Sequence, residues 1–411
     1  MNLSNTLSDK KKYLQNKVLT KRFIILFVIL LIGTHFLGLE PFAYYINKGN
    51  LTYFIQILSL TPLAIYITKR YRNIYIKWLF LLWCFLLINK ISSIYFRNIP
   101  LTNSIFQGVY VYDFLFFYLF YFLNPSIKQM ERCIIYLGSA GLIIYFIQYC
   151  ILPIPIVESI SQGWRISGEY NKIDIQRFSI TGEGIIYLCG LLSLNKYLLN
   201  RKITFLVICL LALSVSILHG YRSITIGYIF SFIFLYYKIN GLKLNKNFIY
   251  VLFIFIIVMS FVLFSNLFND VLQLYKDKNS RMANYTDIDR VKEFIYFYNS
   301  ISKPWEWIFG AGFIGINFKK DLISHNWVDL GFIGMSFMGG IILTFIWIRL
   351  LLLNLRKIPT RYIYLSAFSI FIILSTITLN VAFADKCIVI QTLAFYLFHK
   401  VKRLNQICHL K

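Results

Sequence analysis

Residues 134–154 read IIYLGSAGLIIYFIQYCILPI and contain no charged residue. A run of about twenty apolar residues is long enough to cross the hydrocarbon core of a bilayer as one helix. In lipid the backbone must satisfy its own hydrogen bonds, which a helix does within a single segment. The stretch therefore predicts a transmembrane helix.

Apolar segments of this kind recur along the whole chain. Hydrophobic residues make up 58% and charged residues 14% of the 411 residues, and the mean hydropathy of +0.65 is far from that of a soluble globular protein. The expected spans are residues 23–39, 51–68, 78–94, 105–123, 134–154, 182–199, 203–218, 224–237, 248–268, 327–347, 362–383 and 387–398. The sequence therefore predicts an all-α, polytopic integral membrane helical bundle of about twelve transmembrane helices. We expect a single domain over residues 1–411.

The basic residues indicate how these spans are oriented. The formal net charge is +25, and the lysines and arginines collect in every second connection. Clusters precede the first span, follow the second span at Lys69 and Arg70, and follow the fourth span at Lys128 and Arg132. Loops rich in Lys and Arg stay in the cytoplasm, so both chain termini are expected to be cytoplasmic.

Two long connections, residues 156–181 and 269–325, are then expected on the external side. The second carries eight Lys/Arg and seven Asp/Glu residues, a near balance that argues against nucleic acid as a partner. Apolar residues at helical spacing in Tyr285–Ile301 predict an amphipathic helix on the membrane surface. Pro304 is expected to end this helix, and the glycines after it are expected to allow tight turns.

Motifs for metals, disulfides and nucleotides are missing from the sequence. The seven cysteines show neither metal-ligand nor disulfide spacing, and they are expected to be thiols buried in lipid. The chain has no Walker A lysine motif and no dinucleotide-type glycine fingerprint. We therefore expect no metal, no organic cofactor and no ATP hydrolysis.

Polar side chains on the external side are the candidates for chemistry. Arginine stays charged and forms bidentate hydrogen bonds to phosphate. Several arginines at a membrane surface therefore suit a lipid-linked diphosphate, which carries its own leaving group. Transfer of a glycan from such a donor also needs a base for the acceptor hydroxyl. The candidates are His325, Glu183 and a charged residue of the long loop.

Simpler structural roles stay open for several of the external residues. Tyr221 and Arg222 also fit an aromatic belt with a snorkelling arginine. His325 also fits an interfacial histidine that is satisfied by backbone groups. Arg281 and Arg290 also fit solvated ion pairs with nearby aspartates of the same loop.

Short motifs resemble elements of the bacterial O-antigen polymerase and ligase superfamily. Residues 177–183 (RFSITGE) are similar to an Arg-x-Ser-x-x-x-Glu stretch that enters a span, although the Pro that often follows is Gly184 here. Residues 221–223 (YRS) are similar to the Ser-Arg-Ser/Ala start of a helix. Residues 307–313 (WIFGAGF) and 324–334 (SHNWVDLGFIG) are similar to the family's Gly-x-Gly and His-Asn elements. The number of spans and the long late external loop resemble the family as well.

The resemblance implies a glycosyltransferase of the bacterial inner (cytoplasmic) membrane that uses an undecaprenyl-diphosphate-linked oligosaccharide. Arginines matching Arg177 and Arg222 are implied to hold the diphosphate, and His325 matches a histidine in the long loop of the ligases. Membrane lipids and a chain-length regulator protein are the other expected partners. The resulting catalytic assignment is His325, Glu183, Arg222 and Arg177. The resulting substrate-binding assignment is Arg165, Tyr221, Arg281, Arg290 and Asn326.

The expected activity is that of a surface polysaccharide polymerase, which transfers a growing O-antigen or capsule glycan to a lipid-linked repeat unit. One alternative is a ligase that transfers the finished glycan to a lipid A core or a protein. Another is a flippase or transporter of lipid-linked oligosaccharide, a class that usually has polar residues through the membrane midplane. Here the span interiors are largely uncharged apart from Asp113, expected to be partnered in the bundle, and Lys90, expected to snorkel.

Overall fold

The structure, a computed structural model, describes residues 21, 23–34, 37, 50–71, 73–97, 100, 109–150, 182–218, 222–241, 291, 293–301, 303–312, 330–377 and 387–409. All elements within these residues are helices, and no strand occurs among them. The all-α prediction is therefore confirmed for this part of the chain. Two of its helical segments, Ile74–Tyr95 and Ile127–Gln148, are long and apolar enough to cross a membrane.

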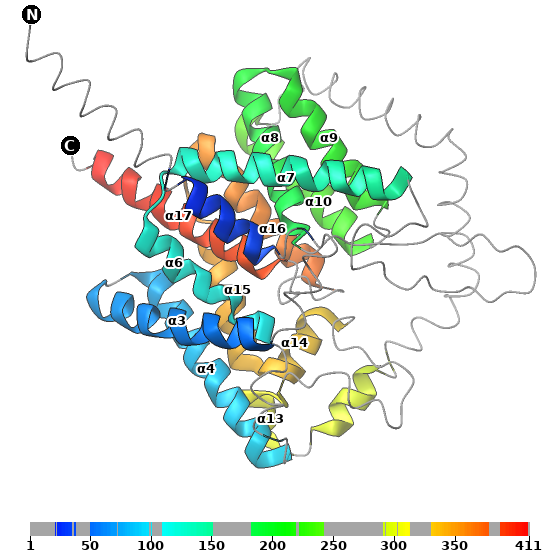
Figure 1. The fold of residues 1–411 in the computed structure, drawn as a ribbon. Helices are drawn as coiled ribbons and strands as arrows, with labels where there is room; N and C mark the ends of the chain where they lie inside the picture. The colour runs from blue at the N-terminus through cyan, green and yellow to red at the C-terminus, as the bar shows by residue number, and fades with distance from the viewer. Residues whose placement is uncertain are drawn as a thin grey trace, which may run out of the picture.

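One group of helices packs around a central helix, α8 (Gly184–Asn200) (Figure 1). Its neighbours are α7 (Ile127–Cys150), α9 (Ile203–Leu218), α10 (Arg222–Asn240) and α16 (Ile363–Thr376). Nearly every side chain of α8 is buried. Glycines allow the closest approaches, since a Cβ at Gly138 would lie 2.7 Å from the Sγ of Cys189, and one at Gly190 would overlap the hydroxyl of Tyr228.

A second group lies on the other side of the long C-terminal helix α17 (Ile388–His409) (Figure 1). It comprises α3 (Asn50–Arg70), α4 (Ile74–Arg97), the 3-10 helix η2 (Val109–Leu115), α6 (Phe116–Leu123) and α15 (Ile341–Leu353). The indole Nε1 of Trp347 on α15 donates a 3.0 Å hydrogen bond to Oε1 of Gln391 on α17. Because α17 also contacts α7, α8 and α16, it joins the two groups.

Short helices cover one end of this second group. They are α13 (Pro304–Phe309), α14 (Gly331–Gly339) and a helical segment at residues 293–300. Phe337 of α14 packs against three other aromatic rings. Its ring centroid lies 5.8 Å from that of Phe294, 5.9 Å from that of Phe297 and 5.2 Å from that of Trp307. The predicted helix within Tyr285–Ile301 is therefore confirmed over residues 293–300, where aromatic packing holds it against α14.

Most expected spans that the structure describes coincide with helices, but two are divided. The span 105–123 contains η2 followed by α6, and the span 327–347 is interrupted at Gly340, which has a φ of 87°. Pro304 is the first residue of α13, because the first helical position needs no backbone N–H. The span 248–268 and the connection 156–181 lie outside the described residues.

Basic residues from alternate connections gather at one end of the bundle, which we name the Lys400 end. There Lys196 Nζ lies 3.4 Å from a carboxylate oxygen of Glu131, and the Asn195 amide donates a 2.7 Å hydrogen bond to the Arg361 carbonyl. The Nζ of Lys400 donates a 2.8 Å hydrogen bond to Oδ1 of Asn124. The opposite end, where α8 and α10 begin, is named the Glu183 end.

Candidate functional site

Glu183 immediately precedes the central helix α8 and is only 5% exposed. Its backbone carbonyl accepts a 2.8 Å hydrogen bond from the N–H of Ile186, which starts the helix. The residue before it, Gly182, has a φ of 75° and packs so closely on Thr34 that a Cβ would lie 2.5 Å from the Thr34 Cβ. A positive φ and this contact both favour glycine, so the turn that buries the Glu183 side chain requires Gly182.

The start of α10 lies at the same end of the bundle as Glu183. Helices α8 and α10 run in the same direction because α9 returns the chain between them. The rings of Tyr187 and Tyr228 are 5.7 Å apart, and both contact Phe371 on α16. Tyr187 lies one turn after Glu183, and Tyr228 lies less than two turns after Arg222. A rise of about 1.5 Å per residue therefore places the backbones of Glu183 and Arg222 within about 5 Å of the same level.

A side-chain hydrogen bond fixes the start of α10 against the end of α9. The hydroxyl of Thr225 donates to the carbonyl oxygen of Ser216 over 2.7 Å. Gly227 then lets α10 approach α16, since a Cβ there would lie 2.5 Å from the Ser375 Oγ. The backbone that carries Arg222 is thus held from two sides.

The Glu183 end concentrates positive helix-dipole potential. The N-termini of α8 and α10 both lie there, and each carries partial positive charge on its first N–H groups. This potential stabilises the Glu183 carboxylate and attracts anionic groups of a ligand. A buried carboxylate beside an arginine-bearing helix start can serve as a base, and the helix start can hold an anion.

The structure describes two of the nine residues expected in the site. The side chain of Glu183 is described in full, and Arg222 is described as the first backbone residue of α10. These two are brought to the same end. The others lie outside the described residues: Arg165, Arg177, Tyr221, Arg281, Arg290, His325 and Asn326.

A second polar region between α4 and the short helices was missed by the sequence interpretation. The side-chain amide of Asn89 donates to the carbonyl oxygens of Phe309 and Met338, over 2.6 and 2.9 Å. Lys90, next to it, is 5% exposed. The snorkelling expected for Lys90 is therefore wrong, because its side chain is enclosed within the protein. An asparagine inside an apolar run was the available signal.

Asp113 is another charged residue that the sequence places inside an expected span. Asp113 lies in η2 and is 2% exposed, as expected for an acid enclosed in the bundle. Among the described residues, no group of three or more His, Cys, Asp or Glu side chains is placed to hold a metal ion.

No family model, curated protein or solved structure matches the chain. The described part of the candidate site consists of a buried carboxylate and a paired helix start, which suits an anionic ligand with a hydroxyl to be deprotonated.

Proposed function

We propose that the protein is an integral membrane glycosyltransferase of about twelve spans that polymerises a surface polysaccharide. Its donor is a growing glycan on undecaprenyl diphosphate, and its acceptor is a lipid-linked repeat unit such as that of an O-antigen or capsule. The observation that carries the proposal is the buried Glu183 at the start of α8, level with the Arg222-bearing start of α10.

Membrane embedding is supported by composition and by the exposed faces of the helices. Two helical segments are long and apolar enough to cross a bilayer. Large apolar side chains are exposed along helices of both groups, such as Ile143, Phe230 and Phe345. A soluble protein exposes such side chains singly, whereas here they recur on helix after helix. We propose that these faces contact lipid.

The proposed orientation follows from the two ends of the bundle. The Lys400 end gathers the basic residues of alternate connections, and such residues stay on the cytoplasmic side. We therefore propose that the Glu183 end faces outward in the bacterial inner membrane, with both termini inside. A lipid-linked glycan on the outer leaflet would meet the starts of α8 and α10.

The proposed reaction is a single displacement in which atoms and charges balance. The acceptor hydroxyl oxygen attacks the anomeric carbon of the donor sugar, and the bond between that carbon and the diphosphate oxygen breaks. The hydroxyl proton passes to a carboxylate or imidazole, for which Glu183 and His325 are the proposed bases. The departing diphosphate stays on its lipid, and the guanidinium groups of Arg177 and Arg222 stabilise its charge.

The deciding experiment examines surface polysaccharide from a deletion strain complemented with wild type, Arg222→Ala or Arg222→Lys. We expect the deletion to lose the long-chain ladder and to keep a single repeat unit on its acceptor. Neither variant should restore the ladder, because lysine lacks the bidentate fork of arginine. Full ladders from both variants would contradict the role of Arg222. Full-length polymer accumulating on the lipid carrier in the deletion strain would identify a ligase instead.

A transporter of lipid-linked oligosaccharide is the second candidate. It is favoured by the interrupted helix at Gly340 and by the buried Lys90 of α4, since secondary transporters carry broken helices and polar groups within the membrane. The location of accumulated repeat units separates the two candidates. A strain lacking a transporter retains the lipid-linked unit on the cytoplasmic leaflet, whereas a strain lacking a polymerase displays it outside.

A further inference from the structure

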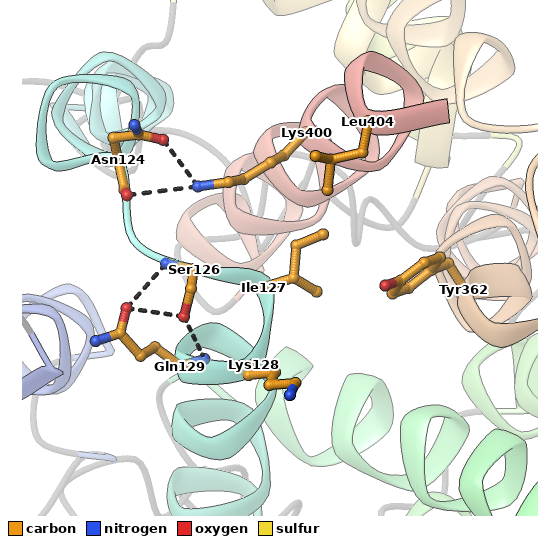
Figure 2. Close-up of a pocket in the computed structure, with 8 residues that line it drawn as sticks. All are labelled: Asn124, Ser126, Ile127, Lys128, Gln129, Tyr362, Lys400 and Leu404. Carbon is orange, nitrogen blue, oxygen red and sulfur yellow. Dashed lines mark hydrogen bonds between the residues drawn. The ribbon is translucent and has the colours of Figure 1, made fainter. Parts of the chain in front are cut away.

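A hollow of about 420 Å³ lies at the Lys400 end, at the opposite end of the bundle from Glu183 and Arg222 (Figure 2). It forms where the start of α7, the start of α16 and the last turns of α17 meet. Its volume falls within the range of small-molecule sites, about 300–1,000 Å³. The lining residues are Asn124, Ser126, Ile127, Lys128, Gln129, Tyr362, Lys400 and Leu404.

The charge of the hollow is positive. Its lining includes two lysines, Lys128 and Lys400, and no acidic residue. Glu131, the nearest acid along α7, accepts a 3.3 Å hydrogen bond from the Tyr364 hydroxyl and lies 3.4 Å from Lys196 Nζ. That carboxylate is therefore engaged by the Tyr364 hydroxyl and the Lys196 ammonium. Further basic residues follow close by in the sequence: Arg132, Arg361, Lys402 and Arg403.

The floor of the hollow is fixed by hydrogen bonds, and Figure 2 draws those of Lys400 with Asn124 and of Ser126 with Gln129. Lys400 Nζ donates to Oδ1 of Asn124 at 2.8 Å and also to the carbonyl oxygen of Pro125, which ties α17 to the turn before α7. Ser126 and Gln129 form a reciprocal cap: the Ser126 N–H donates to Oε1 of Gln129 at 2.9 Å, and the Gln129 N–H donates to Oγ of Ser126 at 3.2 Å. The first turn of α7 adds its dipole to the positive field.

The exposed face of α7 continues from the hollow as an apolar stripe. Lys128 and Arg132 are exposed at its start, followed by Tyr136, Ile143 and Ile147, which are 56%, 60% and 46% exposed. At 100° per residue these five positions fall within about one third of the helix circumference. They extend over about 28 Å of the helix. The basic end suits the phosphate of a phospholipid, and the apolar stripe is long enough to lie along its acyl chains.

We propose that this hollow binds the phosphate of an anionic phospholipid, whose acyl chains lie along the exposed face of α7. Basic pockets between helices at the cytoplasmic leaflet favour anionic headgroups in this way. The proposal rests on the membrane embedding argued above and is independent of glycosyl transfer. The ligand chemistry is that of a phosphate diester, and the lipid is its source because the stripe supplies a site for the chains.

The test compares wild type with Lys128→Gln, Lys128→Arg and the control Lys202→Gln in nanodiscs that contain phosphatidylglycerol and phosphatidylcholine. Both lysines are exposed, so neither change disturbs a core, and both glutamine variants alter the net charge equally. After extraction in mild detergent, retained phosphatidylglycerol is measured by mass spectrometry. We expect about fivefold less retention for Lys128→Gln and wild-type retention for Lys128→Arg and Lys202→Gln.

Equal phosphatidylglycerol retention in all four proteins would overturn the site. A second arm adds inorganic phosphate or glycerol phosphate to protein in discs of phosphatidylcholine alone and follows thermal unfolding. If free phosphate stabilises the protein as much as phosphatidylglycerol does, the lipid is not the ligand and the proposal fails. If the chain does not enter nanodiscs at all, the membrane embedding fails first, which separates that outcome from loss of the lipid site alone.

Discussion

Gly310 and Gly340 lie backbone against backbone. A Cβ on Gly310 would lie 2.5 Å from the nitrogen of Gly340, and a Cβ on Gly340 would lie 2.8 Å from the nitrogen of Gly310. Their φ and ψ angles are 82° and 159° for Gly310, and 87° and 157° for Gly340, a region that is essentially reserved for glycine. The end of α13 and the break between α14 and α15 thus form one contact.

Gly340→Ala is expected to destabilise the protein by at least about 3 kcal/mol, from backbone strain and the overlap together. Thermal unfolding in detergent micelles measures this. Gly241→Ala is the matched control, because Gly241 has a φ of 68° but nothing within 4 Å of its would-be Cβ. The Gly241→Ala variant should lose only the free energy needed to hold alanine at a positive φ, about 1 kcal/mol. Equal losses in the two variants would contradict the backbone contact.

Asn89 is expected to stabilise the same junction through its amide. Replacing it with leucine keeps the side-chain volume but removes the donors to Phe309 and Met338. We expect a loss of about 2–4 kcal/mol in unfolding free energy, since two buried hydrogen bonds disappear at once. Ile88→Ala, at a partly exposed position one residue earlier, should cost less than about 1.5 kcal/mol. A loss no larger than that of the Ile88 variant would show that the amide does not hold the junction.

The helices were predictable because their signal is local. A run such as 203–218 is apolar at every turn, and α9 occupies it residue for residue. The breaks were not predictable, because tertiary contacts decide them. The span expected at 327–347 reads as one apolar stretch with several glycines, and only the contact with Gly310 explains why the helix stops at Gly340.

The candidate site shows the same division between local and long-range information. Glu183 was identified from its motif, whereas the turn before it packs on Thr34, which is distant in the sequence. Lys90 was assigned to the interface because lysines often snorkel. Its burial depends on tertiary packing around α4, which no periodicity in the sequence predicts.

Glu183→Gln is expected to lower polymer formation at least about a hundredfold while the protein stays folded, because the amide cannot accept the hydroxyl proton. The readout is the chain-length ladder normalised to folded protein. Glu131→Gln is the control, since both glutamates are buried but lie at opposite ends of the bundle. Losing the contact with Lys196 should lower stability by about 1 kcal/mol and leave activity per folded molecule unchanged. Normal polymer from Glu183→Gln would reject its role as a base.

His399 is expected to make the protein sensitive to acid. It lies just beyond the span expected at 387–398, and burial, followed by the charges of Arg403, Lys400 and Lys402, lowers its pKa to about 4. Its ring Nδ1 lies 2.9 Å from the amide nitrogen of Asn73. The folded pKa is below the unfolded value of about 6.5, so the contribution of His399 to stability is fully present above about pH 6.5. This contribution is lost as the pH falls from about 6.5 toward 4, because the unfolded chain binds the proton first.

The contribution of His399 to this loss is up to about 3 kcal/mol. Melting temperatures of wild type and His399→Gln, compared between pH 7.5 and 4.5, isolate it from the other groups. The variant should be less stable at pH 7.5 and should lose less stability on acidification. Parallel pH profiles for the two proteins would show that His399 does not supply the acid sensitivity.

The orientation of the bundle is open to a direct test with single cysteines. In a background without native thiols, Ser280→Cys and Ser324→Cys lie in the connection expected outside, and Leu404→Cys lies at the Lys400 end, where Leu404 is 47% exposed. An impermeant maleimide should label the first two in intact cells, because the basic residues keep the Lys400 end in the cytoplasm. Leu404→Cys should be labelled only after the inner membrane is permeabilised. The reverse pattern would place Glu183 inside, where a donor on the outer leaflet cannot reach it, and would remove the basis of the proposed reaction.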